Sequence, residues 1–133
     1  MKNKMVRKIT NVEIPVTDLK QSLKWYTEML GLEVQHQDND SAMLSFELHG
    51  AATIFLVKTE KPSKLVFHNT SWGIAENSVI DFYTEDLQDC HQWMKEQGVK
   101  VSELNGHEDG LSGFGVTDPD GHVFGICNAD HDR

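Results

Sequence analysis

The sequence predicts one α+β domain built from two similar modules, and three observations support this. The chain has 133 residues, a length that suits a single hydrophobic core. A segment near the N-terminus recurs in the second half of the chain. In both halves, segments of alternating hydrophobicity and segments with helical spacing follow one another in the same order. We therefore treat residues 1–133 as one domain.

The internal repeat sets the order of the elements. The segment from Asp18-Leu19 to Trp25 matches the segment from Asp86-Leu87 to Trp93. After one deletion, Gly31-Leu32-Glu33-Val34 matches Gly98-Val99-Lys100-Val101. Each copy is predicted to hold a strand, an acidic cap, a helix, a closing glycine and another strand. Module one then covers about residues 8–58, a connection about 59–77, and module two about 78–128.

Each predicted helix has a defined start and end. Asp18 and Asp86 can accept hydrogen bonds from the first-turn N–H groups, and Gly31 and Gly98 can adopt the left-handed conformation after the last turn. One core-facing stripe is predicted on each helix because apolar or boundary residues recur at helical spacing. The stripes consist of Leu19, Leu23, Tyr26 and Leu30, and of Leu87, Cys90, His91 and Met94.

Strands are predicted on both sides of the helices. Val12, Ile14 and Val16 share one parity before the first helix, and Ile80 and Phe82 do so before the second, so these faces should meet the helices. Further strands are expected near 42–48, 53–57, 113–117 and 123–127, with a short one at 64–68. Asp118-Pro119-Asp120-Gly121 predicts a tight hairpin turn, because Pro presets one turn angle and Gly supplies a positive one.

Composition and charge exclude several classes of function. The formal net charge of −9 argues against a nucleic-acid partner, which needs a basic footprint. No apolar run approaches the ~20 residues of a membrane-spanning helix, and residues 1–10 lack the apolar centre of a secretory signal. We expect a cytoplasmic protein whose cysteines, Cys90 and Cys127, are both reduced.

These motifs carry a family resemblance that spans about residues 8–128. The run Glu13-Ile14-Pro15-Val16-Thr17-Asp18-Leu19, then Ser22, Trp25-Tyr26 and Leu30-Gly31-Leu32, together with the Asp-Pro-Asp-Gly hairpin, resembles the glyoxalase / bleomycin resistance / extradiol dioxygenase family, or vicinal oxygen chelate superfamily. The resemblance implies two βαβββ modules that form a curved, cup-like mixed sheet, with helices outside and a ligand cavity inside. It also implies a homodimer.

Enzymes of that family hold one divalent metal with His, Gln or Glu side chains at four positions in the cup. The resemblance carries these positions onto Asn11 and Phe55 in module one and onto Val79 and Gly125 in module two. None of the four is a usual ligand, and a catalytic divalent ion needs three or more N or O ligands. We therefore expect no cofactor, with a divalent metal as the alternative.

Two carboxylates are the strongest candidates for a polar role. Glu13 and Asp81 are repeat equivalents and lie two residues beyond Asn11 and Val79 on the same strand faces. They could pair with a cationic ligand, bind a displaced metal, act as acid and base, or be solvated carboxylates on an exposed sheet face. The full candidate ligand-binding set is Asn11, Glu13, Phe55, Trp72, Val79, Asp81, Tyr83, His107, Val123 and Gly125.

Six members of this set have their own rationale. Trp72 lies in the connection and could act as a lid or stacking residue, and His107 lies in a polar loop that could close over a ligand. Gly125 replaces a long side chain with none, which is expected to open space for a larger ligand. Val79, Val123 and Phe55 in former ligand positions suggest an apolar lining.

The function that the sequence favours is metal-independent binding of a hydrophobic or cationic small molecule. The alternative is a lyase, isomerase or dioxygenase of the same fold that uses a non-standard metal or carboxylate site. A third hypothesis is an interaction module with a vestigial cup. No catalytic residue is assigned, and neither a nucleic acid nor a membrane is expected as a partner.

Overall fold

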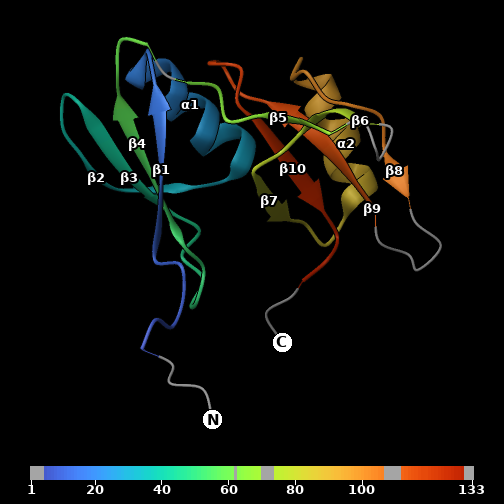
Figure 1. Ribbon diagram of the computed structural model, residues 1–133, viewed down its shortest axis with the longest axis horizontal. Helices are drawn as coiled ribbons and strands as arrows, with labels where there is room; N and C mark the ends of the chain where they lie inside the picture. The colour runs from blue at the N-terminus through green and yellow to red at the C-terminus, as the bar shows by residue number, and fades with distance from the viewer. Residues whose placement is uncertain (1–4, 62, 70–73, 107–111, 131–133) are drawn as a thin grey trace. The chain divides into compact units, whose positions relative to one another are not determined.

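The computed structural model describes residues 5–61, 63–69, 74–106 and 112–130. These residues form two compact units, Met1–Pro62 and Ser63–Arg133, hereafter the first and second units. The first unit contains predicted module one, and the second contains predicted module two (Figure 1). Neither helix is long and apolar enough to cross a membrane, as far as the described residues extend.

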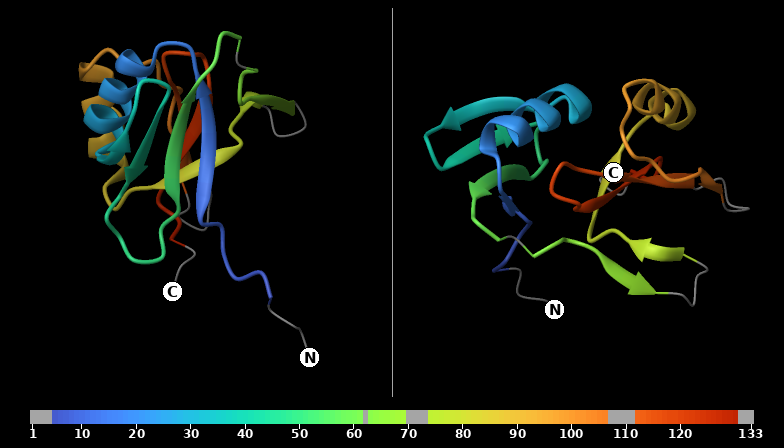
Figure 2. Two further views of the ribbon diagram at one scale, coloured as in Figure 1. Left: turned by 90° about the vertical axis from the view of Figure 1, so that its left-hand side faces the viewer. Right: turned by 90° about the horizontal axis from the view of Figure 1, so that it is seen from above.

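The first unit has the βαβββ order. Its elements are β1 (Asn11–Val16), α1 (Leu19–Leu30), β2 (Glu33–Gln37), β3 (Ser41–Ser45) and β4 (Thr53–Lys58). The strands form a mixed sheet in the order β1-β4-β3-β2, in which β1 is parallel to β4 and the other pairs are antiparallel. Helix α1 packs against β4 and β3 on one face of this sheet (Figure 2).

The second unit repeats this topology. A short hairpin of β5 (Phe67–Asn69) and β6 (Ile74–Asn77) precedes β7 (Ile80–Tyr83), α2 (Leu87–Glu96), β8 (Asn105–Gly106), β9 (Ser112–Thr117) and β10 (Val123–Cys127). The main sheet has the order β7-β10-β9-β8, with β7 parallel to β10. The predicted α+β class and the two-module architecture are therefore confirmed.

The predicted helix caps are confirmed in both units. The Asp18 side chain accepts a hydrogen bond from Gln21 N at 3.1 Å, and the Asp86 side chain accepts one from Asp89 N at 3.3 Å. Gly31 follows α1 with φ of 72°, and Gly98 follows the end of α2 with φ of 79°. Both glycines are needed where the chain turns, because φ is positive there.

The core of each unit lies between its helix and its sheet. Ile14 and Val16 of β1 are fully buried, as their parity predicts. On α1 the buried residues are Leu19, Ser22 and Tyr26, and on α2 they are Leu87 and Met94. The remaining predicted stripe residues, Leu23, Leu30, Cys90 and His91, are only half-buried.

One predicted element differs from the structure. A strand was expected at Gly98–Val101 after the second helix, but this segment makes only an isolated bridge between Val101 and Val116. The fourth strand of the sheet is instead the two-residue β8, within a segment whose polar residues and glycine predicted a loop. Polar side chains that do not alternate give no strand signal, so here tertiary pairing with β9 sets the element.

The predicted hairpin turn joins β9 to β10. Asp118 Oδ1 accepts hydrogen bonds from the N–H groups of Asp120 and His122, at 2.9 and 2.8 Å, and Gly121 has φ of 87°. His122 is fully buried, and its Nδ1 accepts a hydrogen bond from Leu65 N at 2.9 Å. The turn therefore also holds the segment that precedes β5.

Candidate functional site

A cavity of about 490 Å³ lies in the second unit. Strand alternation places Phe82, Phe114 and Phe124 on the face toward α2, where His91 of α2 contacts the Phe114 ring edge-on at 4.7 Å. Asp81, Val123 and Gly125 have the opposite parity and line the cavity. The cavity therefore lies on the sheet face that is turned away from the helix.

Glycines form the floor of this cavity. Gly115 of β9 pairs with Gly125 of β10, and Gly113 pairs with Cys127, so backbone without side chains is presented across two neighbouring strands. A Cβ at Gly115 would make only ordinary contacts, the nearest 3.5 Å from Ser102 Oγ. A Cβ at Gly113 would lie 2.9 Å from the Ile126 carbonyl oxygen, so that position requires glycine.

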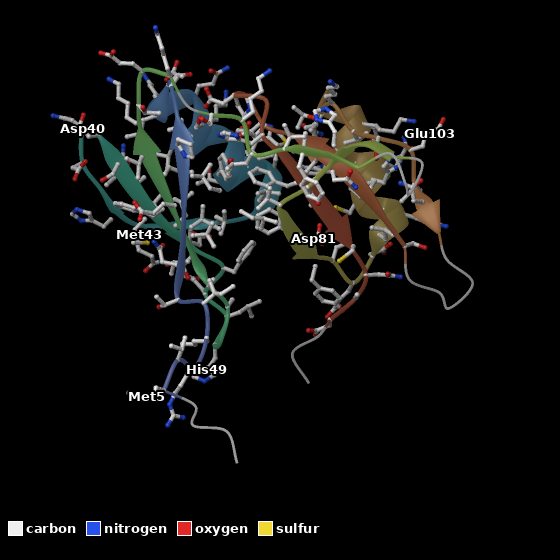
Figure 3. All side chains as sticks on the ribbon, in the orientation of Figure 1. Met5, Asp40, Met43, His49, Asp81 and Glu103 are labelled. Carbon is white, nitrogen blue, oxygen red and sulfur yellow. The ribbon has the colours of Figure 1, made fainter. Side chains whose placement is uncertain are left out.

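Asp81 projects from β7 (Figure 3). Its carboxylate lies directly against Gly125 of β10. A Cβ on residue 125 would overlap Asp81 Oδ1 and lie 2.9 Å from Ser78 Oγ. Ser78 Oγ donates a hydrogen bond of 2.7 Å to the same Oδ1. The expectation that Gly125 leaves space for a larger ligand is therefore wrong at this point, because the side chain of the neighbouring strand occupies that space.

Sequence reasoning missed several polar residues of the cavity. Ser102 Oγ accepts a hydrogen bond from Gly115 N at 2.7 Å, while the Ser102 carbonyl oxygen lies 2.8 Å from His91 Nε2. Lys100, Asn77 and Ser78 also line the cavity. Lys100 was missed because it was assigned to the strand expected at Gly98–Val101, which does not form. Ser102 follows that segment, and no pattern in the sequence singled it out. For Ser78, the available signal was a hydroxyl three residues before Asp81, a spacing at which it reaches that carboxylate.

The first unit brings three other predicted residues together on its own sheet. Asn11 and Glu13 lie on the β1 face opposite α1, and Phe55 of β4 pairs in register with Glu13. Asn11 Oδ1 accepts a hydrogen bond of 2.8 Å from Thr53 Oγ1. Glu13 is exposed, and Phe55 is half-buried.

The remaining candidates are separate from the cavity or outside the described residues. Val79 is 59% exposed, precedes β7 and does not line the cavity. Tyr83 is 48% exposed and pairs with Cys127, which does line it. Trp72 and His107 lie outside the residues that the structure describes.

The donor atoms at the family's metal positions do not fit a divalent metal centre. Of those four residues, only Asn11 has a side-chain donor atom, and its oxygen is hydrogen-bonded to Thr53. Across the described parts of the chain, no three His, Cys, Asp or Glu side chains gather as a metal site requires. The carboxylate of Asp81 is the anionic group in the second-unit cavity.

The two cysteines differ in their surroundings. Cys90 lies on α2, and burial raises the pKa of its thiol, with a smaller opposing effect from a hydrogen bond with Thr84. Cys127 lines the cavity, and its Sγ lies 3.9 Å from the Ala129 carbonyl oxygen. Both are free thiols, as predicted.

Comparisons with known proteins agree on the fold. The model of the Glyoxalase/Bleomycin resistance protein/Dioxygenase superfamily matches residues 8–126. Lactoylglutathione lyase from Agrobacterium tumefaciens has a TM-score of 0.69 at 14% identity, covering 93% of this chain and 95% of the lyase. No match was found among curated proteins.

Two further solved structures are similar over nearly the whole chain. An integron cassette protein from the mobile metagenome of Halifax Harbour Sewage Outfall has a TM-score of 0.72 at 19% identity, covering 93% of this chain and 100% of its own. TnmS3, an antibiotic binding protein from a Streptomyces species, has a TM-score of 0.72 at 18% identity, covering 96% of this chain and 100% of its own. With its repeated βαβββ units and a family match over residues 8–126, this chain belongs to the Glyoxalase/Bleomycin resistance protein/Dioxygenase superfamily.

Proposed function

We propose that this protein binds a hydrophobic or cationic small molecule in the second-unit cavity, without a metal ion. The observation that carries the proposal is the glycine floor with a single carboxylate set against it. A concave, largely apolar surface with a few fixed polar groups is typical of small-molecule sites. The similarity to an antibiotic binding protein of the same fold is consistent with this function.

The lining determines the kind of ligand. Val123 and the space above Gly115 leave room for an apolar group, whereas Asp81, which lies over Gly125, offers a negative charge. Removing a carboxylate from water without giving it a cationic partner costs free energy. A ligand that covers Asp81 should therefore carry a positive charge or a hydrogen-bond donor at that point. A purely apolar ligand would leave Asp81 facing water.

Filling the cavity tests the proposed location. The first unit carries Met43 at the position that matches Gly115. G115M therefore fills the cavity floor with a side chain that the same position already carries in the other unit. We expect G115M to keep an unfolding temperature close to that of the wild type and to lose about tenfold or more in affinity for naphthalen-2-ylmethylamine, measured by isothermal titration calorimetry. The matched control is G115A, whose Cβ makes only ordinary contacts and leaves most of the cavity open.

Equal affinity in the wild type and in G115M would place the ligand elsewhere and reject the proposed site. Metal independence is tested separately, by elemental analysis of untagged protein and by unfolding temperatures with Zn, Ni, Mn, Fe(II) or EDTA. A resident metal stabilises the folded state by mass action, so its removal by EDTA would lower the unfolding temperature. If binding is metal-independent, as proposed, EDTA should leave the unfolding temperature unchanged. Stoichiometric metal would instead favour an enzyme with a non-standard site.

The homodimer implied by the family resemblance is also proposed here. Light scattering coupled to size-exclusion chromatography measures the molar mass directly. A mass of about twice 15.1 kDa is expected, and a mass of one chain would reject the dimer.

A further inference from the structure

Resting on the proposed function, we infer that the second-unit cavity binds a dipolar ligand, with a cationic group at Asp81 and an anionic group at Lys100. A dipolar ligand here means an elongated molecule whose two opposite charges lie at its two ends. Two opposite charges at opposite sides of one cavity, with an apolar surface between them, carry this inference. It adds an anionic group to the hydrophobic or cationic ligand proposed above.

Asp81 and Lys100 are the two charged residues among the described residues that line the cavity. Asp81 lies on β7, which is one edge of the second-unit sheet. Lys100 lies beside β9 on the side away from β10, where its carbonyl oxygen accepts a hydrogen bond of 3.0 Å from Thr117 N. Figure 3 labels Asp81 and, on the other side of this unit, Glu103, which closely follows Lys100 in the chain. Strands β10 and β9 therefore lie between the two charges.

Lys100 and Ser102 are on the cavity face of the sheet. Val101 lies between them and bridges to Val116, which is fully buried on the face toward α2. Side chains alternate along an extended segment, so the two neighbours of Val101 project to the opposite face. The position of Ser102 Oγ agrees with this, because it lies 3.5 Å from where a Cβ on Gly115 would point into the cavity. The Lys100 ammonium is therefore carried on the cavity side.

The surroundings of Lys100 suit an anionic group. Within the described ranges, neither Lys100 nor Asp81 forms an ion pair. Thr117 is half-buried and lines the cavity beside Lys100, so its hydroxyl offers a second donor. A carboxylate can accept from an ammonium and a hydroxyl at once. Because the chain has a formal net charge of −9, an anion would be repelled over most of its surface, and binding here would depend on Lys100.

The space between the two charges sets the length of the ligand. Val123 of β10 and the open place above Gly115 of β9 separate them. Three strand spacings amount to about 14 Å, and a contact of about 2.8 Å at each end leaves about 9 Å between the charged groups of the ligand. Asp81 and Lys100 are too far apart to neutralise each other across two strands. A ligand with one charge therefore leaves one of them without a partner, whereas a dipolar ligand can pair with both.

The test uses four probes built on one ring system. In 6-(aminomethyl)-2-naphthoic acid the two charges lie at opposite ends, whereas in 4-(aminomethyl)-2-naphthoic acid the same groups lie on one ring. Naphthalen-2-ylmethylamine and 2-naphthoic acid carry one charge each. Calorimetry on the wild type should show that the 6-isomer binds about fivefold or more tightly than each of the other three. The two isomers have the same composition and net charge, so their difference measures the separation of the charges alone.

Two variants remove one charge each. K100M should weaken the 6-isomer and 2-naphthoic acid about fivefold and leave naphthalen-2-ylmethylamine within about twofold, whereas D81N should weaken the 6-isomer and the amine about fivefold and leave 2-naphthoic acid no weaker. In both variants the advantage of the 6-isomer over the 4-isomer should shrink to within about twofold. K100R keeps the charge and should preserve the affinity for the 6-isomer.

The matched control is K95M. Lys95 is exposed in the last turn of α2, which packs on the sheet face opposite the cavity, so K95M removes the same charge from the same unit without touching the site. K95M should bind all four probes as the wild type does. An equal loss in K95M and K100M would assign the effect to net charge and overturn the inference. The unfolding temperature of each variant shows that it is folded.

The outcomes separate this inference from the proposed function. If the amine binds the wild type and loses affinity in G115M, but the 6-isomer binds no better than the amine or the 4-isomer, the cavity binds ligands and the dipolar class is wrong. Unchanged affinity of K100M for the 6-isomer and for 2-naphthoic acid also overturns the inference. If no probe binds the wild type, or if G115M binds as well as the wild type, the proposed function fails together with the inference.

Discussion

The two units share one topology, but only the second has glycines at the centre of its open sheet face. In the first unit, Glu13, Phe55 and Met43 lie side by side on β1, β4 and β3. In the second, the same three places on β7, β10 and β9 hold Asp81, Gly125 and Gly115. Two side chains are thus missing from an otherwise repeated pattern. The difference teaches that a cavity can arise on a duplicated sheet without any change in strand order.

The paired carboxylates also differ in their contacts. Both side chains are exposed, but Glu13 pairs in register with Phe55, whereas Asp81 lies against the backbone of Gly125 and accepts a hydrogen bond from Ser78. A carboxylate can lie flat on a strand only where the neighbouring residue has no Cβ. The repeat therefore preserves the charge while the glycine decides its orientation.

The largest effect is expected in the cores, where Tyr26 and Met94 occupy matching repeat positions. Tyr26 is fully buried, with its ring 5.0 Å from that of Trp25, and Met94 is 2% exposed. Y26A should lower the free energy of unfolding by about 3–5 kcal/mol and M94A by about 2–4 kcal/mol, because each leaves a cavity. Urea denaturation measures both, and a larger loss for M94A would contradict the comparison.

The next largest effect comes from copying the second unit's glycine into the first. F55G should lower the free energy of unfolding by about 2–3 kcal/mol, because it removes a half-buried ring and adds a flexible residue to a strand. The control F55L keeps a large apolar side chain and should cost less. If F55G were as stable as the wild type, Phe55 would have no packing role in the first unit.

A smaller effect is expected at the matching positions of the two helices, Ser22 and Cys90. Among the described side chains, Ser22 Oγ is buried without a hydrogen-bond partner, whereas the Cys90 thiol is half-buried on α2. S22A should raise the free energy of unfolding by about 1 kcal/mol, because it removes an unsatisfied buried hydroxyl. The reference variant S22C inserts the residue that the second unit carries at this position. A loss of stability in S22A would contradict the prediction, because it would show that the hydroxyl has a partner.

The smallest effect concerns Asp38, in the turn between β2 and β3. Hydrogen bonds from the N–H of Asp40 and the Ser41 hydroxyl lower the pKa of this carboxyl from its ordinary 3.8. The stabilisation is present above pH 4 and is lost as the pH falls through the lowered pKa. D38N should therefore be slightly less stable than the wild type at pH 7, and the difference should shrink as the pH falls below 3.8, as measured by urea midpoints. A gap that is constant with pH would assign the effect to something other than this titration.

Much of the fold could be predicted because its signals are local. Asp18 and Asp86 start the helices through their side-chain carboxylates, and Gly31 and Gly98 end them through positive φ angles. The β10 bounds, Val123–Cys127, match the prediction. The strand expected at Gly98–Val101 was wrong because its formation depends on which part of the chain reaches the edge of β9. The partner strand, not the segment itself, determined that element.

The candidate site was predicted less completely. Strand parity together with the family resemblance assigned Asp81, Val123 and Gly125 to one face, in line with the register of β7 and β10, but this reasoning missed Ser78 and Ser102. It also assigned free space to Gly125, which the Asp81 side chain covers. Parity tells which face a residue is on and says nothing about what its neighbours on the adjacent strands do.

The sequence by itself determined the family, the repeated βαβββ order and the pairing of Glu13 with Asp81 as equivalents, since these depend on local periodicity, caps and turn residues. Only the tertiary structure decided that Gly113, Gly115 and Gly125 form one floor and that Asp81 and Ser78 meet above it. The reason is physical: register between strands is a long-range property, and it alone brings residues from β7, β9 and β10 within contact of one ligand.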